Sequence, residues 1–258
     1  MNFSKPSFVI FLFLVFTTCA WAQGQDSLKS ITTYTGSIGF TNNGISIIPS
    51  FSLNKPALVT ILSWRKNKFS VGPDIRITPT LEKGGMLLWF RYHAIEKRKF
   101  SLRLGTHPAL NIQLQQVIKN GVTYEISQAR RFLAWELAPT FYVRKNLALG
   151  LYYLQGNGLQ LDGPRTSHFV NLTAAVSRIK ISKNLSFNLI TAFYYLNLDG
   201  NDGLYLNGSG TLQHSKLPLS LGSTFNYTFT STIPNNKDFM WNATLAYIFR
   251  KTFVRKDS

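Results

Sequence analysis

A strict two-residue alternation of apolar and polar side chains constrains this chain more than any other feature. The stretch LPLSLGSTFNYTFT, from Leu217 to Thr230, has apolar side chains at nearly all odd positions and small or polar side chains at the even positions. Because successive side chains of a β-strand point to opposite sides, this stretch predicts a strand with one apolar and one polar face. What each face contacts depends on how the pattern recurs.

The alternation recurs along most of the chain, in segments that are long for a soluble protein. Strands of soluble sheets usually have about five to six residues, whereas a tilted strand needs roughly nine to eleven to cross a bilayer. Beyond the N-terminus, no amphipathic helix of more than a few turns stands out. The predicted strands are Ile45–Leu53, Ala57–Trp64, Phe69–Thr78, Met86–Ala94, Phe100–Gln115, Leu133–Val143, Leu147–Tyr153, Val170–Ser177, Leu185–Tyr194, Leu204–Gln213, Leu217–Thr230 and Trp241–Phe249.

The polar faces of these segments carry arginine, histidine, glutamate and asparagine, which the core of a soluble sandwich would not accept unpaired. The odd face of Leu217–Thr230 is therefore expected to meet hydrocarbon, and its even face a polar lumen. The sequence predicts an all-β fold, an antiparallel up-and-down transmembrane β-barrel. Aromatic residues expected to form its interfacial girdle are Trp64, Trp89, Trp135, Tyr153, Tyr195 and Trp241.

Short and long connections alternate between the predicted strands, as periplasmic turns and outer loops do in bacterial barrels. The long connections are predicted at Pro79–Gly85, Val117–Arg130, Gln155–Thr166, Asn197–Asp202 and Ser231–Asp238.

Counting back from a periplasmic C-terminus gives twelve strands, with ten or fourteen as alternatives. Ile45–Leu53 is then the first strand, and Ile31–Phe40 would be a thirteenth. We therefore expect Ile31–Phe40 to lie below the barrel or inside its lumen. The predicted parts of the mature chain are an N-terminal periplasmic or lumenal segment at 23–43, the barrel at 44–249 and a basic tail at 250–258.

The N-terminus has the pattern of a cleaved export signal. Lys5 precedes the apolar run Phe8–Phe16, which is too short to span a bilayer, and Ala20-Trp21-Ala22 offers small residues at the cleavage site. We expect a signal peptide at 1–22. Its removal takes away Cys19, the only cysteine, and lowers the formal net charge from +17 to +16 because Lys5 is lost. A lipoprotein acylated at Cys19 is the alternative, but the residues before Cys19 are a poor match for that signal.

Two segments, TNNGISIIPSFSLNKPA and RYHAIEKRKFSLRLGTHPAL, together with the export signal and the alternating strands, resemble outer-membrane β-barrel proteins of Bacteroidota. The resemblance is one of architecture and extends over nearly the whole mature chain. It implies residence in the cell outer membrane, contact with outer-membrane lipid, and insertion by the barrel assembly machinery. It does not imply a particular substrate.

Charged residues on the predicted inward faces form a candidate lumen cluster. Two arginines on neighbouring strands repel each other unless carboxylates or a bound anion compensate. The cluster could therefore be a structural network that fills a narrow lumen, or a selectivity zone for anionic solutes. Its members are Asp74, Arg76, Arg91, Arg103, His107 and Glu136.

The strong positive charge of the chain gathers at the predicted short turns. We found no aromatic platform among these basic residues on which bases could stack, so nucleic acid is not expected as a partner. These basic residues could contact lipid phosphates or an acidic periplasmic partner, or they could simply keep exposed turns soluble. This periplasmic basic rim consists of Arg65, Lys66, Lys68, Lys97, Arg98, Lys99, Arg144, Lys145 and Lys183.

Motifs for catalysis, cofactors and metals are sparse. The pair His214-Ser215 lacks the spaced partners of a lipid hydrolase, so we expect no enzymatic activity, and no nucleotide-binding or metalloprotease motif is present. No cofactor is expected. Asp199 and Asp202 have too few acidic neighbours for a calcium site, so no metal is expected either.

Two functions remain for such a barrel. The first is a passive channel for small, possibly anionic, solutes, which requires an open lumen. The alternative is a closed structural or anchor barrel that works with a periplasmic or envelope partner. A secreted soluble β-sandwich is the third interpretation, if the chain does not enter a membrane.

Overall fold

The computed structural model describes residues 31–46, 51–119, 121–160 and 163–254 of the chain. The predicted signal peptide and Cys19 lie outside these residues. Within them the alternating segments form twelve β-strands, and no helix is long and apolar enough to cross a membrane. The strands are β1 (Ile31–Thr41), β2 (Ala57–Lys66), β3 (Phe69–Ile77), β4 (Gly84–Glu96), β5 (Phe100–Lys119), β6 (Val122–Arg144), β7 (Leu147–Gly158), β8 (Thr166–Lys180), β9 (Leu185–Leu198), β10 (Asn201–His214), β11 (Leu219–Ser231) and β12 (Phe239–Val254).

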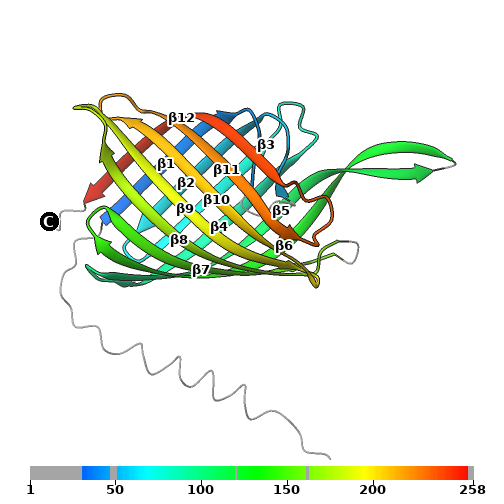
Figure 1. Ribbon diagram of the computed structural model, residues 1–258, viewed down its shortest axis with the longest axis horizontal. Helices are drawn as coiled ribbons and strands as arrows, with labels where there is room; N and C mark the ends of the chain where they lie inside the picture. The colour runs from blue at the N-terminus through cyan, green and yellow to red at the C-terminus, as the bar shows by residue number, and fades with distance from the viewer. Residues whose placement is uncertain (1–30, 47–50, 120, 161–162, 255–258) are drawn as a thin grey trace, which may run out of the picture. The chain divides into compact units, whose positions relative to one another are not determined.

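Each strand pairs antiparallel with the next along the chain, and β1 lies beside β12, so the sheet closes into a barrel (Figure 1). Closure leaves no sheet edge with unpaired backbone groups, as a bilayer requires. The prediction of a twelve-stranded up-and-down barrel is therefore confirmed, and the β-sandwich is excluded.

The first strand corrects the prediction for the N-terminal part of the mature chain. Ile31–Thr41 is β1 and pairs with β2 from Thr32 opposite Lys66 to Thr41 opposite Ala57. Ile45–Leu53, predicted as the first strand, contains no strand in its described residues. Both segments alternate, so the local pattern does not distinguish them. Only Ile31–Thr41 closes the seam between β2 and β12.

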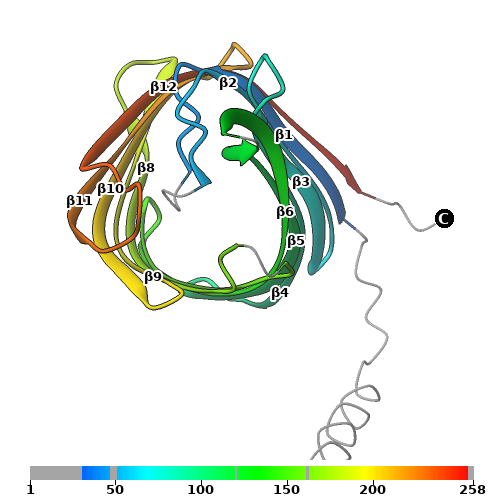
Figure 2. The same cartoon turned by 90° about the vertical axis from the view of Figure 1, so that its right-hand side faces the viewer.

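The connection between β1 and β2 folds into the barrel instead. It is drawn in blue within the ring of strands in Figure 2. The Phe51 ring packs on Phe132 of β6 with ring centroids 5.3 Å apart, and Leu53 is buried. Arg76 of β3 donates from Nη1 to the Ile45 carbonyl at 3.0 Å. These contacts narrow the lumen at this level.

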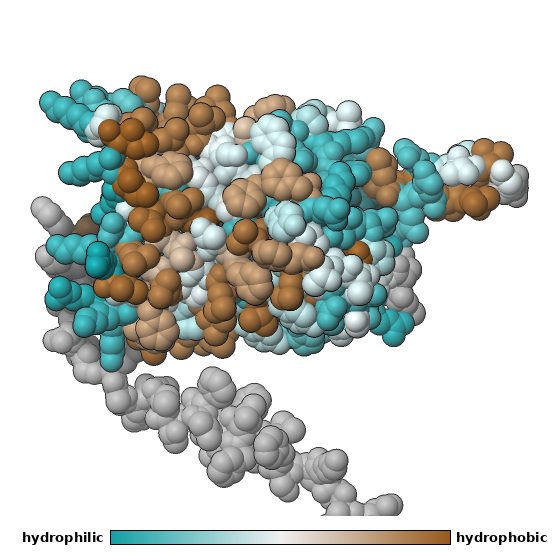
Figure 3. Space-filling model, in the orientation of Figure 1, coloured by the Kyte–Doolittle hydropathy of each residue, from teal (hydrophilic) through white to brown (hydrophobic). Residues whose placement is uncertain are grey.

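The two faces of the strands meet different surroundings, as the alternation predicted. On β11, Phe225 and Phe229 are exposed on the outer surface, whereas Asn226 and Thr228 between them are buried inside the barrel. Figure 3 shows apolar side chains gathered over the visible face of the barrel, with hydrophilic side chains at its left end. A closed barrel with an apolar outer band is the arrangement that strands use to cross a membrane.

The two ends of the barrel differ. The end that holds the start of β1 and the last residues of β12 has only short turns, and the longer connections lie at the other end. Part of the predicted loop Val117–Arg130 is a continuation of β5 and β6, which extend beyond the barrel as a hairpin on the right of Figure 1. β12 continues to Val254, so residues 250–254, predicted as tail, belong to a strand.

Candidate functional site: the charged wall of the lumen

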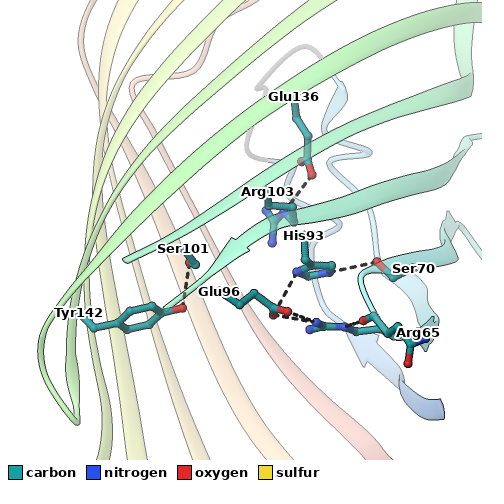
Figure 4. A network of polar contacts seen from close by, with 9 residues as sticks. Arg65, Ser70, His93, Glu96, Ser101, Arg103, Glu136 and Tyr142 are labelled. Atoms are coloured by element: carbon teal, nitrogen blue, oxygen red, sulfur yellow. Dashed lines mark hydrogen bonds and ion pairs between the residues drawn. The ribbon is translucent and has the colours of Figure 1, made fainter. Parts of the chain in front are cut away.

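Glu136 of β6 is the centre of the inward-facing charges. Its side chain is 0% exposed, and its Oε1 accepts hydrogen bonds from Nε of Arg91 at 2.7 Å and Nε of Arg103 at 3.0 Å. Arg91 also donates from Nη2 to Oε2 at 3.3 Å, and Tyr152 of β7 forms a further hydrogen bond with the carboxylate. Figure 4 shows Arg103 directed towards Glu136 across the sheet. One buried carboxylate thus serves two guanidinium groups.

A glycine makes room for this contact. Arg91 of β4, Gly105 of β5 and Glu136 of β6 are opposite one another in the register, so Gly105 lies beneath the ion pair. A Cβ at Gly105 would meet Cγ and Oε1 of Glu136 at 2.7 Å. The absence of a side chain on β5 therefore lets charges from β4 and β6 join above it.

Contacts to the Trp89 ring continue the cluster along the wall. Cζ of Arg91 lies 3.7 Å from the centroid of the Trp89 ring, and the centroid of the His107 ring lies 3.9 Å from the same centroid, with the two rings tilted by 52°. A guanidinium over an indole face is a favourable cation–π contact. Trp89 therefore faces the lumen, which corrects its predicted place in the interfacial girdle. Trp89 is two residues from Arg91 on β4, and side chains two residues apart on a strand lie on the same face. This spacing is the sequence signal that could have placed Trp89 in the lumen.

The remaining two cluster residues form their own pair. Arg76 of β3 makes two hydrogen bonds with Asp74 on the same strand, Nε to Oδ1 and Nη2 to Oδ2, each 3.1 Å. The third contact of Arg76 holds the Ile45 carbonyl, as described above. All six residues predicted for the lumen cluster therefore lie on the inner face. Asp74 and Arg76 hold the folded-in connection, and Glu136 binds Arg91 and Arg103.

A second polar network lies nearer the short-turn end, along the same wall (Figure 4). Arg65 contacts both carboxylate oxygens of Glu96, at 2.7 and 2.6 Å. His93 Nδ1 lies 3.7 Å from Glu96 Oε1, and His93 Nε2 lies 3.4 Å from Ser70 Oγ. Arg65 is the one rim residue with an ion pair in the described parts of the chain.

The other basic residues of the predicted rim lie at strand ends and in turns on this side of the barrel. Lys66 ends β2, Arg144 ends β6, and the rest are in the connections that follow β2, β4, β6 and β8. In Figure 3, hydrophilic side chains project from this end. The basic rim residues thus lie at four turns of one barrel end and are separate from the lumen cluster.

A cavity of about 540 Å³ lies between the charged wall and the folded-in connection. Five of the six cluster residues line it; Glu136 lies behind Arg91 and Arg103. Sequence reasoning missed several other residues that line it, and the alternation of β7 and β8 could have identified two of them. The missed residues are Phe51, Trp89, Tyr152 and Asn171.

Aromatic side chains from β9 and β10 fill part of the barrel interior. Tyr194 of β9 and Tyr205 of β10 are fully buried and stack with ring centroids 4.7 Å apart, and Tyr194 donates to Asn226 Oδ1 at 2.7 Å. Ile233, from the connection after β11, packs in the same cluster. This aromatic cluster narrows the barrel on the side opposite the charges.

Comparison with solved structures places the barrel among known folds. The KdgM porin superposes with a TM-score of 0.51 at 10% identity, covering 83% of this chain and 99% of the porin. The COG4313 outer membrane channel from Pseudomonas putida F1 gives a TM-score of 0.49 at 9% identity, covering 88% of this chain and 99% of the channel. The NanC porin gives 0.47 at 13% identity, covering 86% and 100%. No family model and no curated protein matches the sequence.

The fold is that of a porin-like outer-membrane barrel. The predicted fold class is confirmed, and a closed barrel with an apolar outer band fits the predicted outer-membrane location. At 10% identity the likeness describes the fold and not the solute.

The residues considered for metal binding or catalysis have other contacts in this barrel. Both carboxylate oxygens of Asp199 accept hydrogen bonds from the start of β8, from the backbone N–H groups of Arg165 and Thr166. Asp202 accepts from the Tyr195 hydroxyl at 3.2 Å. Among the described residues no group of three or more possible ligands is placed to hold a metal ion. The two carboxylates thus hold loops together.

Proposed function

We propose that this outer-membrane barrel is a passive channel for small solutes and that it favours anions. The observation that carries the proposal is the ratio of charges around Glu136. Arg91 and Arg103 share one buried carboxylate, and the Arg103 side chain remains 37% exposed towards the cavity. An uncompensated positive charge in a narrow pore raises the local concentration of anions.

The opposite wall supports the same direction of selectivity. Strands β7, β9 and β11 contain no Asp, Glu, Lys or Arg, and the charged residues of β8, β10 and β12 lie near strand ends. The charges that line the cavity come from β3, β4 and β5, and neutral polar residues line it on β7 and β8. A solute in this space meets the field of the arginines without an opposing carboxylate surface.

Conductance in a planar bilayer tests the proposal. The purified protein should give discrete current steps in potassium chloride. In a salt gradient, its reversal potential should have the sign expected of an anion-selective channel. Absence of current steps, with the protein shown to be folded by its heat-dependent mobility on a gel, would contradict a channel. A reversal potential on the cation side would contradict the role of the arginines.

The second candidate is a closed barrel that anchors or assembles an envelope component. Two observations favour it: Phe51 on the folded-in connection crosses to Phe132, and the aromatic cluster occupies the facing strands. In this case the basic rim would be the working surface, with an acidic periplasmic partner or lipid phosphates against it. The same bilayer experiment separates the two candidates, because a closed barrel carries no current.

We also propose that the chain is exported by a cleaved signal peptide in a Gram-negative bacterium and inserted by the barrel assembly machinery. The N-terminal pattern supports export. The resemblance of TNNGISIIPSFSLNKPA and RYHAIEKRKFSLRLGTHPAL supports an origin in Bacteroidota. Mass spectrometry of the protein from its native membrane tests the cleavage, since it should find Gln23 as the first residue.

A further inference from the structure

The cavity beside the charged wall has the lining of a binding site within the lumen. Its volume of about 540 Å³ falls within the range of roughly 300 to 1,000 Å³ that is typical of ligand sites. Much of its wall is apolar, and cations and amides occupy a few positions. The apolar contributors include Phe51, Leu87, Trp89, Phe132, Leu154 and Phe169.

Neutral polar residues also line the cavity, among them Tyr152 of β7 and Asn171 of β8. Nδ1 of His107 and Oδ1 of Asn171 have no hydrogen-bond partner within the described residues, but both atoms are buried beneath the cavity surface and do not face a solute. The charged end of a solute must therefore be held by another group on the wall.

The third element is a cation with unused donors. Arg103 gives only its Nε to Glu136 in the described structure, and its side chain is the most exposed of the three that meet there. The terminal nitrogens of a guanidinium form a fork that matches a carboxylate. Arg103 is therefore the group that would fix the anionic end of a solute.

The register places Arg103 and Asn171 at one level of the barrel. Arg103 of β5 is opposite Ala138 of β6, and Tyr152 of β7 is opposite Asn171 of β8. Three strand spacings of about 4.8 Å separate β5 from β8 along the wall. Ala138 lies between them and lines the cavity, so it leaves space over β6 for a solute that is bound to Arg103.

We infer that the cavity binds a small amphipathic monoanion that has one carboxylate and an aromatic or apolar body. This inference rests on the proposed channel function, which it deepens by naming a solute class. The carboxylate pairs with Arg103, and the body packs on Trp89 and the phenylalanines. Small hydrophilic anions such as acetate lack the body and should bind weakly.

Titration calorimetry on the folded barrel in detergent tests the site without requiring conduction. The probes are 4-hydroxybenzoate, its uncharged relative 4-hydroxybenzyl alcohol, and acetate. Saturable binding of 4-hydroxybenzoate, with weaker binding of the other two, is expected. Equal binding of the acid and the alcohol would overturn the role of Arg103, and no binding of any probe would overturn the site.

Two variants locate the binding. Arg103→Gln should weaken 4-hydroxybenzoate binding by about tenfold or more and leave the alcohol unchanged, because a charge-assisted hydrogen bond is lost. Arg98→Gln, which removes the same charge from the exposed rim, is the matched control and should change the binding of neither probe.

Bilayer recordings with the same probe separate the site from the channel. If both proposals hold, 4-hydroxybenzoate interrupts the chloride current of the wild-type protein and does so less in Arg103→Gln. Binding without any current keeps the site and rejects the channel. If the protein carries current, and the probe neither interrupts that current nor binds to the protein, the channel proposal stands and the binding site is rejected.

Discussion

Arg91 and Glu136 meet across a whole strand: their Nε and Oε1 atoms are 2.7 Å apart although β5 runs between β4 and β6. Gly105 of β5 lies beneath them and leaves the space that the contact needs. Three strands are thereby joined on the inner face, above the backbone hydrogen bonds of the sheet. The charge that Arg103 adds to this pair is what we expect a solute to meet.

Removing Arg91 should destabilise the barrel more than it changes selectivity. Arg91→Gln withdraws the closest partner of a carboxylate that is 0% exposed, and breaking a buried pair costs about 3 to 5 kcal/mol. We expect about 3 kcal/mol, because Arg103 still contacts Glu136. Urea unfolding in lipid vesicles measures it. The double variant Arg91→Gln with Glu136→Gln should recover most of the loss, and a single variant as stable as wild type would contradict this account.

Removing Arg103 should change the ion selectivity more than the stability of the barrel. Because its side chain is partly exposed, Arg103→Gln should cost about 1 kcal/mol or less in the free energy of unfolding. It should shift the reversal potential in a salt gradient towards cations, since the excess lumen charge is lost. With both Arg91 and Arg103 replaced by Gln, both effects should appear together. No change in potential or stability would mean that these arginines do not act in the lumen.

Gly105→Ala tests the space beneath the ion pair. The new Cβ would lie 2.7 Å from Glu136, so the locked side chain must move, at a cost of about 1 to 3 kcal/mol. Gly85→Ala on β4 is the control, because its Cβ would meet nothing closer than the Leu110 carbonyl at 3.5 Å. Unfolding of the two variants under identical conditions is the measurement. Equal stability of both would show that Glu136 relaxes freely.

Phe51→Ala should widen the channel. The Phe51 ring contacts Phe132 and lines the cavity, so truncating it removes bulk from the lumen without touching the barrel wall. Single-channel conductance should rise, and the current steps should be noisier if the connection loses its attachment. Phe40→Ala, which truncates a phenylalanine exposed on β1, should leave the conductance unchanged. A decrease, or an equal rise in both variants, would contradict the constriction.

A matched pair of lysine replacements tests the orientation of the barrel. Lys237 is exposed in the connection between β11 and β12 at the long-loop end, and Lys183 is exposed in the β8–β9 turn at the rim. A membrane-impermeant maleimide should label Lys237→Cys on intact cells and leave Lys183→Cys unlabelled until the cells are opened. If Lys183→Cys were labelled on intact cells and Lys237→Cys were not, the barrel would be inserted in the opposite orientation, with the basic rim outside.

The Asp199 turn should loosen in acid. Burial raises the pKa of Asp199, but hydrogen bonds from the Thr166 and Arg165 backbone and the Thr166 hydroxyl outweigh it, so the pKa lies below its ordinary value. The stabilisation is therefore present above the unfolded pKa of about 3.9 and is lost as the pH falls through the lower folded value. The Arg165 and Thr166 amides should be well protected from hydrogen exchange at neutral pH and less protected near pH 3, when each measured rate is divided by the intrinsic rate at the same pH. Asp199→Asn should abolish this dependence of the protection on pH.

The alternation in the sequence is a local property, because successive side chains of any strand point to opposite sides. It therefore determined the all-β class, the long strands and the face on which each residue lies. This alternation and the distance from the short turns assigned to the inner face Asp74, Arg76, Arg91, Arg103, His107 and Glu136. The same rule applied to Trp89 would have placed it beside Arg91, whereas its position near a strand end suggested the girdle.

Which segment completes the barrel was decided by the tertiary structure. Ile31–Thr41 and Ile45–Leu53 both alternate, but only the first pairs with β2 while lying beside β12. That choice depends on hydrogen bonds between strands at opposite ends of the chain, which no local pattern contains. The same holds for the joint contact of Arg91 and Arg103 with Glu136 over Gly105, and for the unpaired atoms of His107 and Asn171. The sequence by itself determined which side chains face inwards; the three-dimensional register decided which of them meet, because register is set by the closure of all the strands together.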